Sequence, residues 1–258
     1  MTEKPTGQSA RTLHGGFDAN LDFPLLDSYW APLLKSGRCQ IASYTDLEAL
    51  TQALLAHLLD FSYLPSANCF FLRRDPLLRG IASACSARSG KPVQSSVFIV
   101  KKSNPVTSWR ELRGKRLGYI NTFCTTSYFS PSILLAREGL ELNAFFDAFA
   151  VPAWQGQIDA VVAGSIDATM VYEDVWQAKP QNAVETRIID RLDGLPTPPF
   201  IARTDVDRAF VATLKSELLA YKPHPTPGTL YAGFADYQGD AMQRFFAELE
   251  TIPGMAAR

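Results

Sequence analysis

Short apolar strand patterns alternate with amphipathic helix patterns along most of this 258-residue chain. Val97–Val100 is a continuous apolar run rich in β-branched residues, which is typical of a strand buried on both faces. Thr45–Glu48 and Ser108–Glu111 each have the spacing of a capping box at a helix start. Repeated alternation of strand and helix favours a parallel α/β sheet in each half of the chain.

The sequence places these elements by residue. We expect strands over 13–17, 39–43, 61–64, 97–100, 115–120, 149–151 and 168–172, and helices over 23–34, 47–58, 66–74, 125–138, 155–163 and 206–221. Gly15–Gly16 would allow another segment to approach the first strand closely. Gly139 and Gly164 follow helix patterns where a left-handed residue closes a helix.

Charge and composition exclude several classes of protein. The formal net charge is -1 and no basic run stands out, so nucleic-acid binding has no electrostatic basis. No stretch approaches the roughly 18 apolar residues that span a bilayer. The first eight residues are polar and do not resemble a secretory signal. Two alternatives remain open: a cytoplasmic protein, or a chain whose signal has been removed.

The four cysteines and three histidines are scattered without metal-ligand spacing. The sequence therefore predicts no metal site and no cofactor. The even cysteine count permits two disulfides, but buried free thiols are the expected state in a chain this large.

Four motifs occur in the order found in one protein family. The chain resembles the phosphonate/phosphite-binding branch of the type II periplasmic solute-binding proteins, which are the soluble receptors of ATP-driven importers. The resemblance rests on the segments Leu59–Ala67, Ser95–Val100, Leu112–Leu117 followed by Cys124–Pro131, and Ala160–Ala168.

This resemblance implies an α/β fold with two lobes and a hinge of two crossing strands. We expect lobe one to hold residues 1–102 and 204–258 and lobe two residues 103–203, with crossings near 100–104 and 198–203. A small anionic ligand would lie in the interlobe cleft, and hinge closure would bury it. The family also implies a monomer, an ABC permease partner and a periplasmic location.

The helix start at Cys124, Thr125, Thr126 and Ser127 is the candidate anion site. The unpaired amides and partial positive charge of a helix start hold an anion without a basic side chain, and first-turn hydroxyls add donors. The alternative is that one hydroxyl only caps its own helix.

Three further positions, with five residues, follow from the family pattern, each with a structural alternative. Tyr44 would contact the ligand or be an ordinary loop aromatic. Ser95 and Ser96 would donate to the ligand or be solvated at a sheet edge. Glu173 and Asp174 would contact a cationic or protonated end of the ligand, or only favour a helix start.

Three positions depart from the family. Gln94 replaces a tyrosine, Trp154 replaces a histidine, and Cys124 replaces a serine whose hydroxyl is a stronger donor than a thiol. These replacements weaken or change polar contacts and add an aromatic surface, unless Trp154 belongs to the core. They argue against an ordinary phosphonate as the ligand.

Three functions are compatible with these observations. The first is capture of a phosphonate, phosphite or phosphate ester for import. The second is a cytoplasmic enzyme on the same fold, as some cofactor-biosynthetic proteins are, with Cys124 as nucleophile, although the sequence places no base beside it. The third is a ligand-sensing module that acts on a protein partner.

Overall fold

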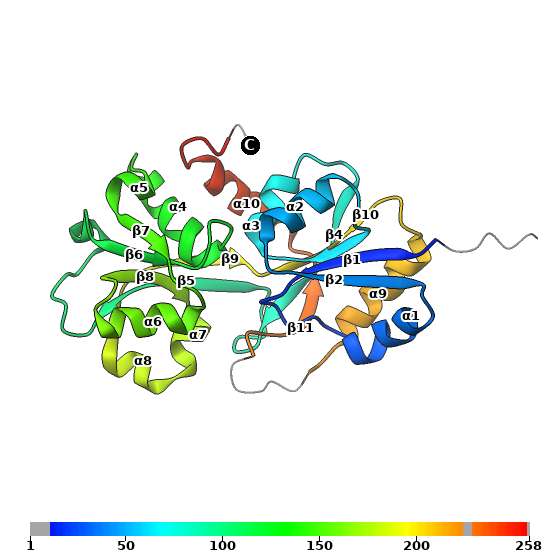
Figure 1. Ribbon diagram of the computed structural model, residues 1–258, viewed down its shortest axis with the longest axis horizontal. Helices are drawn as coiled ribbons and strands as arrows, with labels where there is room; N and C mark the ends of the chain where they lie inside the picture. The colour runs from blue at the N-terminus through cyan, green and yellow to red at the C-terminus, as the bar shows by residue number, and fades with distance from the viewer. Residues whose placement is uncertain (1–10, 224–228, 257–258) are drawn as a thin grey trace, which may run out of the picture.

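The computed structural model describes residues 11–223 and 229–256. The chain forms two lobes, and each is built around one mixed β-sheet with helices on both faces (Figure 1). No helix within the described ranges is long and apolar enough to cross a membrane.

Lobe 1 contains a six-stranded sheet of order β11-β4-β10-β3-β1-β2. β1, β2 and β3 run parallel to their neighbours in this group, whereas β10 and β11 pair antiparallel with theirs. The strands are β1 (Leu13–Asp18), β2 (Cys39–Tyr44), β3 (Phe61–Tyr63), β4 (Leu78–Ser86), β10 (Pro199–Arg203) and β11 (Tyr231–Asp236). The lobe is therefore assembled from both ends of the chain.

An aromatic stack fills the core of lobe 1. The Trp30 and Phe61 rings are stacked with centroids 4.7 Å apart, and Phe200 stacks on Phe61 at 5.9 Å. Gly15 on β1 faces this stack, since a Cβ there would lie 2.1 Å from a carbon of the Phe61 ring. The close approach expected at Gly15–Gly16 is confirmed. The lobe's helical elements are η1 (Leu26–Trp30), α1 (Ala31–Lys35), α2 (Leu47–Leu55), α3 (Ser66–Leu72) and α9 (Arg208–Ala220).

Lobe 2 contains a five-stranded sheet of order β7-β6-β8-β5-β9. β6 is parallel to β7 and β8, and β5 is antiparallel to β8 and β9. The strands are β5 (Val93–Lys101), β6 (Arg116–Tyr119), β7 (Asp147–Ala150), β8 (Ala168–Tyr172) and β9 (Thr186–Pro196). The helical elements are η2 (Trp109–Leu112), η3 (Thr125–Phe129), α4 (Ser130–Ala136), α5 (Leu142–Phe145), α6 (Trp154–Ala163), α7 (Glu173–Ala178) and α8 (Pro180–Glu185).

Two chain segments cross between the lobes, and the second is hydrogen-bonded to the end of β4. The first joins β4 to β5, and the second, Thr197–Pro198, joins β9 to β10. Thr197 donates its hydroxyl to the Ala84 carbonyl at 2.5 Å, and the Ala84 N–H donates to the Pro198 carbonyl at 3.0 Å. The hinge is a two-stranded antiparallel ribbon that continues into both sheets.

The C-terminal helix α10 (Gly239–Glu250) lies between the two lobes (Figure 1). Its Phe246 packs against Phe70 of α3 in lobe 1 at 5.9 Å between ring centroids. Its Glu248 forms an ion pair with Arg137, the C-cap of α4 in lobe 2, at 2.9 Å. One apolar cluster includes residues of α2, α3, α4, α5 and α10, so the described lobes are packed against each other at this side.

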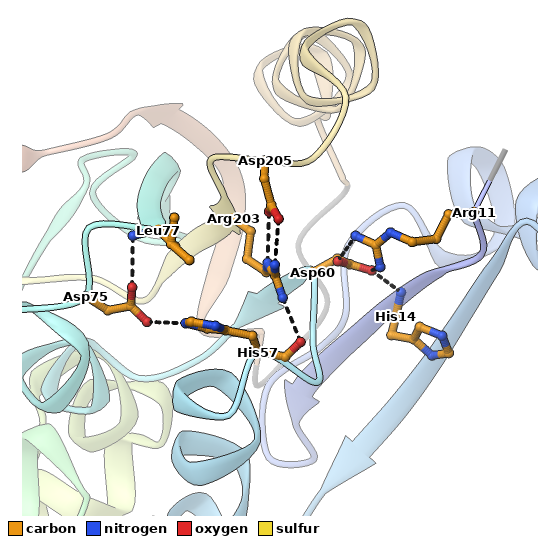
Figure 2. A network of polar contacts seen from close by, with 8 residues as sticks. All are labelled: Arg11, His14, His57, Asp60, Asp75, Leu77, Arg203 and Asp205. Carbon is orange, nitrogen blue, oxygen red and sulfur yellow. Dashed lines mark hydrogen bonds and ion pairs between the residues drawn. The ribbon is translucent and has the colours of Figure 1, made fainter. Parts of the chain in front are cut away.

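A polar network fastens the edge of lobe 1 where β1 and β3 begin and β10 ends. Figure 2 shows its members: Arg11, His14, His57, Asp60, Asp75, Leu77, Arg203 and Asp205. The buried Asp60 carboxylate accepts two hydrogen bonds from Arg11, at 3.0 and 2.5 Å, and one from the His14 N–H at 2.8 Å. Arg203 donates to the His57 carbonyl at 2.7 Å. A buried carboxylate with this many donors is satisfied.

Most of the predicted strands and helices are confirmed, and the Ser108 capping box is present. The helix-start prediction at Thr45 was wrong by one residue, because Asp46 is the N-cap and its carboxylate accepts from the Glu48 and Ala49 N–H groups. Ser66 does not cap α3; its hydroxyl donates to the Pro196 carbonyl at 2.8 Å.

The expectation of parallel sheets was also wrong, because β5, β10 and β11 run against their neighbours. The first crossing lies between Ser86 and Val93 rather than near 100–104, since β5 already belongs to the second sheet. The lobe limits at 102/103 and 203/204 stay a prediction. Because β4 and β10 belong to one sheet and β5 and β9 to the other, we propose that the limits lie inside the β4–β5 and β9–β10 connections.

Replacing Gly15 with alanine should destabilise lobe 1. The added methyl group would overlap Phe61, which the Trp30 and Phe200 rings hold in place. We expect the free energy of unfolding in urea to fall by about 1–3 kcal/mol. Gly156→Ala is the matched control, because α6 leaves open space there, and it should raise stability by about 0.5–1 kcal/mol. Equal stabilities for the two variants would contradict this packing.

Asp167 should make stability depend on pH. Hydrogen bonds from Arg116, at 2.9–3.1 Å, hold the pKa of the Asp167 carboxyl below its usual range although partial burial raises it. Because the folded-state pKa is lowered, this stabilisation is present above the unfolded pKa, about 4, and is lost as the pH falls through the folded-state pKa.

In Asp167→Asn, the free energy of unfolding should therefore fall less steeply below about pH 4 than it does in the wild type. Its effect at neutral pH should stay under about 1 kcal/mol, because the pair is partly exposed. Urea unfolding between pH 3 and 7 measures both, with the exposed Asp27→Asn as control. A wild-type profile in both variants would rule out this contribution.

Candidate functional site

Two adjoining cavities lie between the lobes. The smaller cavity, about 380 Å³, includes Asp18, Cys124, Thr125, Trp154 and Tyr172 in its wall. The larger cavity has a volume of about 630 Å³. Its wall includes residues of both lobes: Asp22, Tyr63, Trp154, Asp174, Lys179, Tyr221, Tyr231 and Phe234. Asn20, Leu21, Ala153 and Trp154 belong to both walls, so the two cavities meet there.

The predicted helix start is formed by η3, a π-helical turn that continues into α4. Cys124 is its N-cap, and the thiol sulfur accepts from the Ser127 N–H at 3.4 Å. The Ser127 hydroxyl instead accepts from the Ile120 N–H at 2.9 Å, and the Thr125 hydroxyl accepts from the Ala67 N–H at 3.2 Å. The capping function therefore belongs to the cysteine and to none of the three hydroxyls.

The main-chain N–H groups of Thr125 and Thr126 have no hydrogen-bond acceptor among the described residues. Both residues are almost completely buried, at 1% and 0% exposure, and Thr125 borders the smaller cavity. Unpaired buried N–H groups are rare and costly. At a helix start, two such groups form a position for an anionic oxygen.

The Cys124 thiol has no base beside it among the described residues. Its sulfur lies 3.4 Å from the Thr126 hydroxyl and 3.4 Å from the Ser127 nitrogen.

All four cysteines are buried and free, as expected. Burial raises the pKa of Cys39 to about 11 and that of Cys69 to about 12. No group of three or more potential metal ligands occurs within the described part of the chain.

Gln94 fastens the hinge rather than lining either large cavity. Its amide donates to the Pro196 carbonyl at 3.0 Å and to the Tyr172 hydroxyl at 3.4 Å. Its amide oxygen accepts from the Tyr231 hydroxyl at 2.8 Å. Through these three bonds, Gln94 of β5 is joined to β9, to β8 of lobe 2 and to β11 of lobe 1.

Trp154 lies where the two cavities meet. Its ring packs edge-on against Tyr172, with centroids 5.1 Å apart, and its buried indole N–H has no partner among the described residues. The preceding Ala153 has φ 62° and ψ 142°, a backbone conformation that only glycine adopts easily. The packing around α6 therefore holds a strained residue at the wall of the site.

Carboxylates outnumber cations around the cavities. Asp18, at the end of β1, is 4% exposed, and burial raises the pKa of its carboxyl while hydrogen bonds from Asn20 lower it. Asp174 accepts from the Ser86 hydroxyl across the lobes at 2.5 Å. Among the described lining residues, Lys179 is the one cation and Asp22 the third acid.

Several predicted site residues lie outside the two cavity walls. Tyr44 packs beside Gly16 in the core of lobe 1. The Ser96 hydroxyl donates to the Thr126 carbonyl at 3.3 Å and so supports η3, while Ser95 donates to Asp193 at 2.6 Å. Glu173 forms an ion pair with Arg191. The structure brings Cys124, Thr125, Trp154 and Asp174 to the cavities; the ligand-binding role of all these residues stays a prediction.

Among the lining residues that the sequence reasoning missed are Asp18, Asn20, Tyr63, Tyr172 and Tyr231. For Asp18 and Tyr172 a signal was available, because both end strands whose carboxyl ends point toward the same cleft. Tyr231 had none, since β11 follows a proline-rich segment and pairs only through distant residues.

Comparisons with known proteins agree with this geometry. The family model of "ABC transporter, phosphonate, periplasmic substrate-binding protein" matches residues 38–239. No curated protein matches the chain at a significant level.

Solved structures share the fold at low sequence identity. A Xanthomonas citri protein with bound ATP is 20% identical with a TM-score of 0.74, over 93% of this chain and 98% of that one. A Prochlorococcus marinus protein in complex with methylphosphonate is 17% identical with a TM-score of 0.70, over 94% and 100%. A binding-protein component of an ABC phosphonate transporter from Pseudomonas aeruginosa is 15% identical with a TM-score of 0.67, over 96% and 93%.

The two-lobed α/β fold of the type II periplasmic binding proteins is thus confirmed. The family match extends over most of the chain, including η3, both crossings and β8, which ends at the cleft. This chain belongs to the family of periplasmic substrate-binding proteins of phosphonate ABC transporters.

Proposed function

We propose that this protein captures a phosphonate, phosphite or phosphate ester in the smaller cavity and presents it to an ABC permease. The observation that carries the proposal is a pair of unpaired N–H groups buried at a helix start: that of Thr125, which borders the smaller cavity, and that of the neighbouring Thr126. The family match supports the same class of ligand.

The anion would be held by dipoles and not by a counter-charge. No Lys or Arg is among the described residues that line the smaller cavity, and Asp18 is its one ionisable acid. The partial positive charge at a helix start is about half a unit, which suits a singly charged oxyanion better than a doubly charged one. Cys124 supplies a weak donor where relatives have a hydroxyl.

Hinge closure would complete the site. Asp18 and Pro65 of lobe 1 line the smaller cavity together with Thr125 of lobe 2, so a ligand in this cavity would meet both lobes. A ligand that binds the closed form more tightly shifts the population toward it. We propose that the closed form is what the permease recognises, that the protein acts in the periplasm, and that it works as a monomer and binds neither nucleic acid nor a cofactor.

Restoring the hydroxyl at position 124 should strengthen phosphonate binding. A serine can still accept from the Ser127 N–H and would donate a stronger hydrogen bond to an anionic oxygen. We expect Cys124→Ser to bind methylphosphonate about tenfold more tightly by calorimetry. Cys124→Ala, which offers no donor, should not improve binding.

Two results would contradict this proposal. Equal affinity of the wild type and Cys124→Ser would remove the residue from the ligand site. Failure of every variant to bind methylphosphonate, phosphite or phosphate at millimolar concentration, with an intact fold, would remove this ligand class.

Asp174 should favour ligands with an amino group. Its carboxylate lines the larger cavity within the interlobe cleft, and its bond from Ser86 would survive in an asparagine. We expect the wild type to prefer 2-aminoethylphosphonate over ethylphosphonate, and Asp174→Asn to lose about 3- to 10-fold of that preference. Glu173→Gln is the control, because Arg191 holds that carboxylate. A preference unchanged in Asp174→Asn would assign Asp174 to the fold alone.

A further inference from the structure

The larger cavity exceeds what a short phosphonate needs. Ligand cavities of about 300–1,000 Å³ accept drug-sized molecules. The smaller cavity of about 380 Å³ is therefore large enough by itself for an anionic group with a short substituent. A further 630 Å³ adjoins it through Asn20, Leu21, Ala153 and Trp154. A substituent that extends past Trp154 would enter this larger space.

Aromatic rings form much of the wall of the larger cavity: Tyr63, Trp154, Tyr221, Tyr231 and Phe234. Ring packing fixes them in place. Tyr63 lies edge-on to Phe234 at 5.7 Å, and Tyr231 is edge-on to Tyr172 at 6.3 Å, which in turn contacts Trp154. Rigid rings present apolar area to a ligand at little cost in side-chain entropy.

Two polar features define what the substituent must be. The buried Trp154 N–H has no acceptor among the described residues, and buried donors ordinarily have one. The charged side chains described in the wall are Asp22, Asp174 and Lys179, which favours a neutral or cationic group over an anionic one. A polyphosphate chain does not fit this charge.

We propose that the larger cavity is a subsite for an uncharged aromatic ring that bears a hydrogen-bond acceptor, attached to the phosphonate or phosphate monoester group. This inference rests on the proposed function, because the anionic group anchors the ligand at η3. Trp154 sets the specificity: its ring packs on the substituent and its N–H donates to the acceptor.

Calorimetry with a matched ligand series tests the subsite. The probes are methylphosphonate, phenylphosphonate and 4-pyridylphosphonate, titrated into the full chain. The wild type should bind phenylphosphonate about tenfold more tightly than methylphosphonate, and the pyridyl ligand more tightly again. Trp154→Leu should remove most of the aromatic preference, and Trp154→Phe should keep the preference for phenyl but lose the extra gain of pyridyl.

Tyr221→Leu is a second variant, needed where Trp154→Leu fails to fold. Tyr221 lines the larger cavity and not the smaller one. This variant should also lower the phenyl-to-methyl affinity ratio. Phe149→Ala removes an exposed ring outside both cavities and should change nothing. Methylphosphonate binding that equals or exceeds phenylphosphonate binding would overturn the subsite and leave the proposed function standing. Absence of binding for all three probes would overturn both.

Discussion

The antiparallel ribbon at the hinge is the constraint on which the rest of the structure depends. Its two segments pair through Ala84, Thr197 and Pro198 and continue as β10 with β4 in one sheet and β5 with β9 in the other. Because the ribbon belongs to both sheets, a rotation of one lobe must be absorbed within a few residues. Gln94 adds hydrogen bonds from this ribbon to Tyr172 and Tyr231. These two aromatic residues of the cleft wall are therefore linked directly to the hinge.

The proposed anion site consists of backbone groups and not of charged side chains. The π-helical turn at η3 leaves two N–H groups unpaired, because the first N–H groups of a helix have no acceptor within it and the Cys124 sulfur accepts from Ser127. Two serine hydroxyls hold this turn in place: Ser96 of β5 donates to the Thr126 carbonyl, and Ser127 accepts from the N–H of Ile120, the residue after β6. The surrounding carboxylates would then act against any anion that the turn does not hold directly. Under the proposed function, selectivity and affinity would therefore come from different groups in the cleft.

The sequence predicted the elements whose own residues define them. β8 was predicted at its observed bounds because Ala168–Tyr172 is bounded by a helix-closing glycine and an acid pair. β4 and β9 were missed, since β4 is rich in Ala and Ser and β9 carries charges and a glycine; both are strands because distant partners pair with them. The proposed anion site follows from a local motif. The larger cavity could not, because Tyr63, Trp154 and Tyr231 meet only once both lobes are formed.

The path of the chain also orders how the molecule is assembled. Lobe 2 is one continuous stretch, whereas the sheet of lobe 1 needs β10 and β11 from beyond it to separate β3 from β4 and cover the outer edge. Long-range strand pairings form late because closing a long loop costs entropy before any contact forms. During synthesis, lobe 1 therefore begins first, with β1, but can complete its sheet only after lobe 2 has been made. Until β10 emerges, β3 and β4 expose unpaired edges to which the strands of other chains could add.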